Sequence, residues 1–134
     1  MNSEIFDSEL FGILNNFNGI TLDKNMIKEK YNLENIDYYI VTKNSHIFIK
    51  YKWIDKSISM NKIDNFIEDC NKINSNSLKI VINEFKIDLS NNNIKLISEK
   101  SVYQTLRKID DAIQQYIAVV YYSNYNCVTL DYIK

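Results

Sequence analysis

Residues 35–53 read NIDYYIVTKNSHIFIKYKW and decide the fold. Two runs rich in β-branched and aromatic residues flank a Lys-Asn-Ser turn, a pattern that predicts a β-hairpin. Because side chains alternate across a strand, Lys50 and Lys52 are expected on the same sheet face as Phe48. The other face of that strand carries only apolar and aromatic side chains. We therefore expect one face to lie on the core and the other to carry charge.

Helical and strand periodicities continue on both sides of this hairpin. We predict helices over residues 3–16, 23–31 and 59–73 and a long helix from residue 101, and strands over 36–42, 46–53, 78–82 and 94–97. Gly19 is expected in the turn after the first helix. The tail from Cys127 to Ile133 is expected to add a terminal strand or to wrap the core. The expected fold class is α/β.

Length and composition limit the organisation of the chain. With 134 residues, 46% of them hydrophobic, the chain suits one domain over residues 1–134. Its formal net charge of -1 lacks the basic excess of non-specific DNA-binding proteins, so any contact with nucleic acid must be local. Lysine, asparagine and isoleucine share A/T-rich codons, and their abundance predicts an A/T-rich genome.

The sequence also bears on where in the cell the protein is found and whether it enters a membrane. The N-terminus is acidic, and the longest apolar stretch, residues 116–122, is far shorter than the roughly 20 residues of a membrane span. Cys70 and Cys127 have no CxxC or His-Cys spacing, so neither a zinc site nor a disulfide framework is predicted. We expect a soluble intracellular protein, cytoplasmic or nuclear, without a membrane partner.

The hairpin carries a motif as well as a fold. Asp37 enters the first strand, and the second strand ends in an apolar-apolar-Lys-x-Lys-aromatic pattern. This arrangement resembles the PD-(D/E)xK nucleases, especially the Mrr-type restriction endonucleases and the Holliday-junction resolvases, from about residue 9 to residue 106. The resemblance implies a restriction-endonuclease-like mixed β-sheet flanked by helices, in the order α-(α)-β-β-α-β-β-α.

The same resemblance implies roles for three residues. Asp37 matches the metal-binding aspartate and Lys52 the catalytic lysine, whereas Lys50 stands where the family places Glu, Asp or Gln. If active, the protein would be a Mg²⁺-dependent DNA endonuclease, but a lysine at this position repels a cation. Other acids could supply the missing ligand, namely Glu9, Glu34 and Asp55.

Three interpretations remain open. In the first, the protein is a degenerate nuclease, weakly active or inactive, that binds the DNA phosphate backbone without a cofactor. Its predicted binding cluster consists of Lys43, Lys50, Lys52 and Lys56. In the second, the fold serves only as a structural or interaction module, and tyrosines 121, 122 and 125 mark a contact with another protein or a second copy. In the third, the lysines are simply solvated on an exposed strand.

Overall fold

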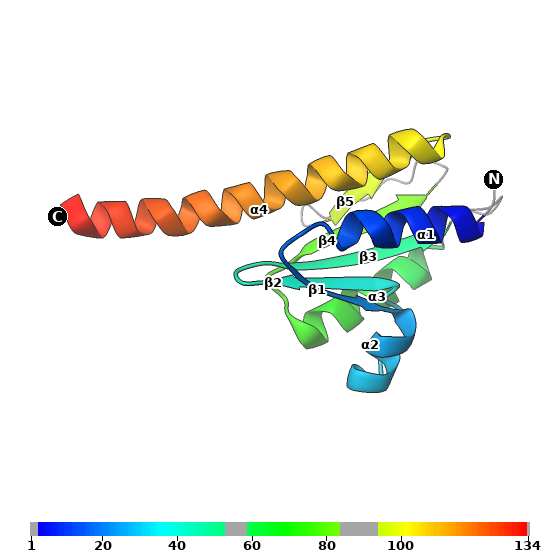
Figure 1. Ribbon diagram of the computed structural model, residues 1–134. Coiled ribbons are helices and arrows are strands. Elements are labelled where there is room, and N and C mark those ends of the chain that lie inside the picture. The colour runs from blue at the N-terminus through cyan, green and yellow to red at the C-terminus, as the bar shows by residue number, and fades with distance from the viewer. Residues whose placement is uncertain (1–2, 53–58, 84–93, 134) are drawn as a thin grey trace.

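The hairpin predicted from residues 35–53 forms the middle of a five-stranded sheet (Figure 1). A computed structural model describes the backbone of residues 3–52, 59–83 and 94–133 and the side chains of residues 5–51, 59–83 and 94–123. In chain order, the elements are α1 (Ser3–Leu14), β1 (Gly19–Asp23), α2 (Lys24–Tyr31), β2 (Tyr38–Thr42), β3 (His46–Lys52), α3 (Met60–Ile73), β4 (Leu78–Asn83), β5 (Ile94–Ile97) and α4 (Val102–Ile133).

The sheet is mixed, with the strands in sequence order from β1 to β5. β1, β2 and β3 are antiparallel neighbours, whereas β4 runs parallel to both β3 and β5. Parallel neighbours need a crossover connection, and α3 supplies the one between β3 and β4. The connection from β4 to β5 falls on residues 84–93, outside the described residues.

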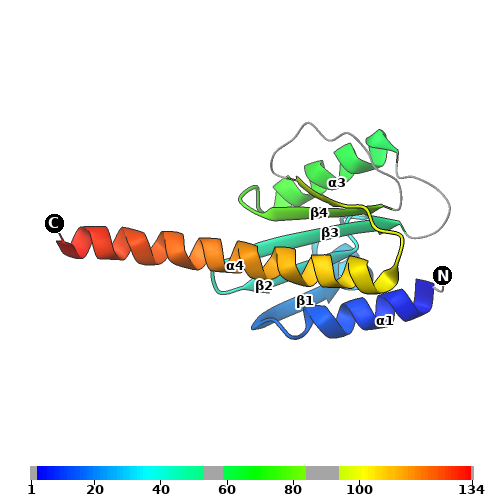
Figure 2. The same cartoon turned by 90° about the horizontal axis from the view of Figure 1, so that it is seen from above.

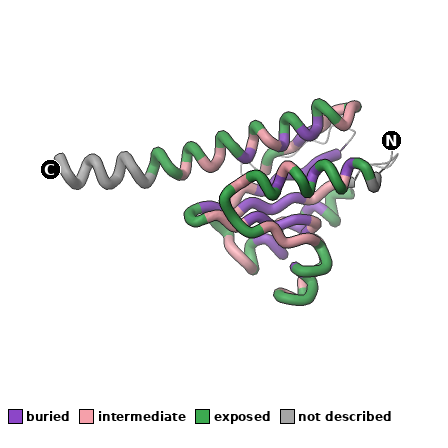
Figure 3. Tube along the Cα trace, in the orientation of Figure 1, coloured by how far each residue is buried: buried purple, intermediate pink, exposed green. Residues whose placement is uncertain are grey.

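Helices cover both faces of the sheet (Figures 1 and 2). On one face, α1 and α4 pack against the strands through Phe6, Leu10, Leu14, Leu106, Ile109 and Ile113, all buried. On the other face, α2 and α3 do the same through Ile27, Ile63, Phe66 and Cys70. Figure 3 shows that the buried positions concentrate in the central strands. The protein is thus α/β, with a five-stranded mixed sheet flanked by helices.

This two-sided cover shows that the interpretation of an exposed, solvated strand face is wrong for Lys50. Phe48 is fully buried in the core beneath α2 and α3, and Lys50, on the same side, has a side chain only 14% exposed. Lys50 is therefore not a solvated residue on an open strand. The alternation along β3 does hold, but no feature of the hairpin itself indicates that a second helical layer covers the lysine face.

Capping residues mark the N-terminal ends of α2 and α3. The side chain of Asp23 accepts a hydrogen bond from the Met26 backbone at 2.9 Å and caps α2. Ser59 caps α3 in the same way, accepting from the Lys62 backbone at 3.3 Å. Such caps satisfy N–H groups that have no partner within the helix.

β1, between α1 and α2, is a strand where the sequence predicts a turn. It pairs with β2 along its whole length, from Gly19 opposite Thr42 to Asp23 opposite Tyr38. A Cβ atom on Gly19 would lie 2.3 Å from the carbonyl oxygen of Val41, so glycine is needed for close strand contact rather than for a turn.

The C-terminal prediction is also wrong. The stretch from Cys127 continues α4, a helix of 32 residues that ends at Ile133. Ser101 accepts a hydrogen bond from the Gln104 backbone at 3.1 Å, as expected of a residue preceding a helix. The C-terminal half of α4 extends past the ends of the strands, on the side of the β2–β3 turn (Figures 1 and 2).

Candidate functional site

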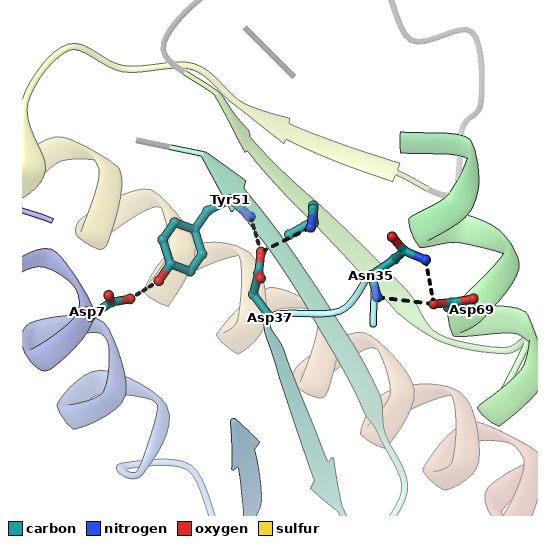
Figure 4. Close-up of polar contacts among 6 residues, drawn as sticks. Asp7, Asn35, Asp37, Tyr51 and Asp69 are labelled. Carbon is teal, nitrogen blue, oxygen red and sulfur yellow. Dashed lines mark hydrogen bonds and ion pairs between the residues drawn. The ribbon is translucent and has the colours of Figure 1, made fainter. Parts of the chain in front are cut away.

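Asp37 and Lys50 meet at the end of the sheet where β2 begins and β3 ends. The Asp37 backbone N–H donates to the carbonyl of Ile49 at 3.0 Å, and its Oδ2 accepts from the Tyr51 backbone at 2.9 Å. Lys50 Nζ lies 3.8 Å from the same Oδ2, and both side chains are largely buried. Figure 4 shows Asp37 directed toward Tyr51 and β3. The hairpin thus brings together two of the predicted site residues.

Burial dominates the electrostatics of this pair. Desolvation raises the pKa of Asp37 above its usual 3.8, although the nearby ammonium groups of Lys50 and Lys24 oppose the shift. Desolvation likewise lowers the pKa of Lys50, opposed by Asp37 and reinforced by the positive charges of Lys24 and Lys62. For both groups, removal from water outweighs the mutual attraction.

Lysines from three separate elements converge beside this ion pair. Lys24 and Lys28 on α2, Lys62 on α3 and Lys50 on β3 line a cavity of about 440 Å³, which we call the lysine cavity. Asn25, Glu34 and Asn35 complete its lining. Lys28 and Glu34 form an ion pair at 3.0 Å near the surface, with both side chains mostly exposed. Lys50 lies deeper, with most of its side chain removed from solvent.

Asp69 on α3 fixes the loop that leads into Asp37. Its side chain is 8% exposed, and its Oδ2 accepts hydrogen bonds from the backbone and side-chain nitrogens of Asn35, at 3.2 and 3.0 Å (Figure 4). Lys72 Nζ lies 3.9 Å from the other carboxylate oxygen. This network ties α3 to the segment between α2 and β2, and so holds one wall of the lysine cavity in place.

A second cavity, of about 290 Å³, lies on the α1 side of Asp37 and is acidic. Asp7, Asp23 and Asp37 contribute to its lining. Asp7 accepts hydrogen bonds from the hydroxyl groups of Tyr51 and Tyr38. Desolvation raises the pKa of Asp7, and the charge of Asp37 adds to that shift. Asp7 could not be identified from the sequence, because a single acid in the first half of a predicted helix carries no functional signal.

The acids proposed from sequence as replacement ligands do not join Asp37. Glu34 lies in the lysine cavity and pairs with Lys28, while Glu9 is exposed on α1. Asp55 lies outside the described residues. Oδ2 of Asp37 is already engaged by a backbone N–H and by Lys50.

These contacts do not suit a magnesium ion at Asp37. Within the described stretches, no group of three or more His, Cys, Asp or Glu side chains is arranged to hold a metal. A hard divalent cation requires several oxygen ligands, and the ammonium group of Lys50, 3.8 Å from the Asp37 carboxylate, opposes the charge of a cation.

Of the predicted lysine cluster, only Lys43 and Lys50 have described side chains, and these two lie apart. Lys43 is exposed in the β2–β3 turn, at the opposite end of β3 from Lys50, which implies a separation of about 15–20 Å along the strand. Lys52 ends β3 and pairs with Asn83 of β4, but its side chain lies outside the described residues, as does all of Lys56.

Lys24, Lys28 and Lys62 were missed, and a local signal exists only for Lys62 among these three. Lys24 and Lys62 lie in the first turns of α2 and α3, neither of which contains an acidic residue. A helix N-terminus favours negative charge, which Asp23 supplies at α2, whereas α3 begins at the neutral Ser59 and its Lys62 opposes the helix dipole. Their convergence with Lys50 depends on tertiary packing and could not be predicted.

Comparisons of the chain with protein-family models, with curated proteins and with solved structures gave no match. Among the described helices, none has both the length and the apolar character that a bilayer crossing requires.

Proposed function

We propose that the protein binds the phosphate groups of nucleic acid through the lysine cavity and does not hydrolyse them. The observation that carries this proposal is the convergence of Lys24, Lys28, Lys50 and Lys62 on one cavity. Four lysines against one glutamate give its lining a net charge of +3, in a chain whose net charge is -1. Such local positive charge attracts phosphate without any need for a metal.

The relationship to the PD-(D/E)xK nucleases belongs to the same proposal. It is supported by the position of Asp37 at the start of β2 and of Lys50 beside it on β3. A lysine in place of the family's acid removes a metal ligand and adds a phosphate-attracting charge. On this proposal, the substitution removes hydrolysis and keeps phosphate binding, and DNA is the expected partner.

A salt titration tests the binding. The triple variant Lys24→Gln, Lys28→Gln, Lys62→Gln should bind duplex DNA more weakly than the wild type. The slope of log K against log salt should fall by about 2 to 3, because each phosphate that a lysine neutralises contributes about 0.9 to that slope. Fluorescence anisotropy between low and moderate salt measures both quantities.

Lysines far from the cavity provide a matched control. The variant Lys43→Gln, Lys95→Gln, Lys100→Gln removes the same charge from exposed positions. It should bind DNA nearly as the wild type does. Equal losses of affinity in the two triple variants would show that binding follows overall charge, and no binding of duplex, branched or single-stranded DNA at low salt would overturn the proposal.

The exposed part of α4 favours a second candidate function, a module that pairs with a second copy of itself. Residues 112–133 contain one charged side chain, Asp131. Val119, Tyr121 and Tyr122 are about 60% exposed, at 62%, 60% and 61%. A helix of this composition without a partner is marginally stable in water. Two antiparallel copies would cover each other's apolar side chains while keeping their single acids at opposite ends.

Light scattering after size-exclusion chromatography tests this pairing across a range of protein concentrations. The variant Val119→Lys, Tyr122→Lys should shift the protein toward monomer, because like charges would face each other across the contact. Tyr103→Lys, near the start of α4 and 72% exposed, is the control and should leave the mass unchanged. A wild-type monomer at every concentration would contradict this candidate.

A further inference from the structure

We infer that the lysine cavity binds a phosphate monoester, namely the terminal phosphate of a nucleic-acid strand, in preference to phosphates within a strand. This inference rests on the proposed function and specifies its ligand. It follows from three properties of the cavity: its depth, its charge and the helix ends that surround it.

The first property is depth. The side chain of Lys50 is 14% exposed, whereas that of Lys28 at the cavity rim is 59% exposed. A phosphate inside a continuous backbone is flanked by sugars on both sides and reaches surface cations most easily. A strand end can instead enter a concave site, and about 440 Å³ lies within the usual range for pockets that enclose small ligands.

The second property is charge. A terminal phosphate carries about -1.5 to -2 near neutral pH, whereas a backbone diester carries about -1. The lining charge of +3 becomes +2 when Asp37, which pairs with Lys50, is included. A dianion neutralises this charge, and a diester leaves half of it uncompensated. Lys50 in particular gains a second counter-charge, which opposes the lowering of its pKa by burial.

The third property is the arrangement of the helices. Lys24 and Asn25 form the first turn of α2, and Lys62 lies in the first turn of α3, so the N-terminal ends of both helices border the cavity. The end of α3, which the neutral Ser59 caps, adds partial positive charge that favours an anion, whereas the carboxylate of Asp23 already occupies the end of α2. Three structural elements, α2, β3 and α3, therefore contribute positive charge to one cavity, as expected for recognition of a doubly charged group.

The test compares one labelled oligonucleotide in three forms: with a 5′-phosphate, with a 3′-phosphate and with hydroxyl groups at both ends. At fixed salt, we expect a phosphorylated form to bind roughly tenfold more tightly, the factor that one additional hydrogen bond to a charged group supplies. Lys62→Gln should reduce this preference to about threefold or less, and Lys43→Gln should leave it intact.

Lys50→Met should also remove the preference for phosphorylated oligonucleotides. Because Lys50 is buried, this variant can fail to fold, whereas Lys62 is exposed and Lys62→Gln should fold normally. Equal affinity for all three forms would overturn the inference and leave the proposed DNA binding standing. Absence of binding to every oligonucleotide would overturn the proposed function itself. Competition by inorganic phosphate and by a nucleoside monophosphate distinguishes the sources of the monoester: a free nucleotide that binds more tightly than any phosphorylated strand would overturn the assignment to a strand end.

Discussion

We predict that neutralising both members of the Asp37–Lys50 pair stabilises the protein. At 3.8 Å, their attraction is about 4 kcal/mol for an effective dielectric constant of about 20. Burial of each ion costs several kcal/mol, or about 3 kcal/mol for a side chain that keeps some contact with solvent. The pair then costs about 2 kcal/mol relative to two neutral side chains, in accord with the raised pKa of Asp37 and the lowered pKa of Lys50.

A double-mutant cycle measures these quantities. Asp37→Asn keeps an acceptor for the Tyr51 backbone N–H, and Lys50→Met keeps most of the length of the side chain. Each single variant should lose about 1 kcal/mol of unfolding free energy, because it leaves one buried charge alone, and the double variant should gain about 1–3 kcal/mol. The coupling energy should be about 4 kcal/mol. Urea unfolding at neutral pH, followed by circular dichroism, gives all four values.

The exposed pair of Lys28 and Glu34 serves as the control. Their charged atoms are closer, at 3.0 Å, but both side chains are mostly in solvent. Replacement of both by glutamine should leave the free energy of unfolding nearly unchanged. A double variant at Asp37 and Lys50 that is less stable than the wild type, or a coupling energy below about 1 kcal/mol, would refute the reasoning.

Other residues allow tests of packing, protonation and metal binding. Gly19→Ala should destabilise the protein by about 1–3 kcal/mol, because the new Cβ meets the backbone of β2. Gly12→Ala in α1 is the control: its Cβ meets nothing within 4 Å, so this variant should be as stable as the wild type or more stable. Urea unfolding of the two variants measures both effects. The pKa of Asp7 in the folded protein lies above its usual value of 3.8. The contribution of Asp7 to the free energy of unfolding is therefore fully present below pH 3.8 and is lost as the pH rises through the folded-state pKa. Asp7→Asn should therefore gain stability relative to the wild type between acidic and neutral pH, and a constant difference would contradict this. Cys70 is buried and its thiol pKa is raised, so iodoacetamide should modify it only in denaturant, as peptide mass spectrometry would show. Lys50→Glu should create divalent-metal affinity, seen as a rise in Tm with Mn²⁺ that the wild type lacks.

The predictable parts of the fold are those encoded by neighbouring residues. In α3, Ser59 caps the first turn and Ile63, Phe66 and Cys70 recur at helical spacing, a pattern that neighbouring residues alone encode. The alternation around the Lys-Asn-Ser turn likewise predicts β2 and β3. The relation between Asp37 and Lys50 could also be anticipated, because hairpin pairing brings these positions together.

The rest depended on contacts between distant residues. Gly19 looks like a turn residue until β2 is known to lie against it, and the burial of Lys50 becomes apparent only when α2 and α3 cover its face. The lysine cavity joins residues 24, 28, 50 and 62, whose proximity follows from packing of two helices on one sheet. The cluster predicted from sequence instead grouped lysines by proximity in the chain, and so included Lys43 at the far end of the hairpin.

The position of β3 has a consequence for the order of folding. It pairs with β2 through a three-residue turn, but with β4 only after the chain has passed through α3. Hairpins close in about 1–10 μs, whereas pairing across a long crossover must first overcome a larger loss of chain entropy. We expect the β2–β3 pair to be formed in the folding transition state while β4 docks later. Val81→Ala in β4 should then mainly accelerate unfolding, and Ile47→Val in β3 should mainly slow folding.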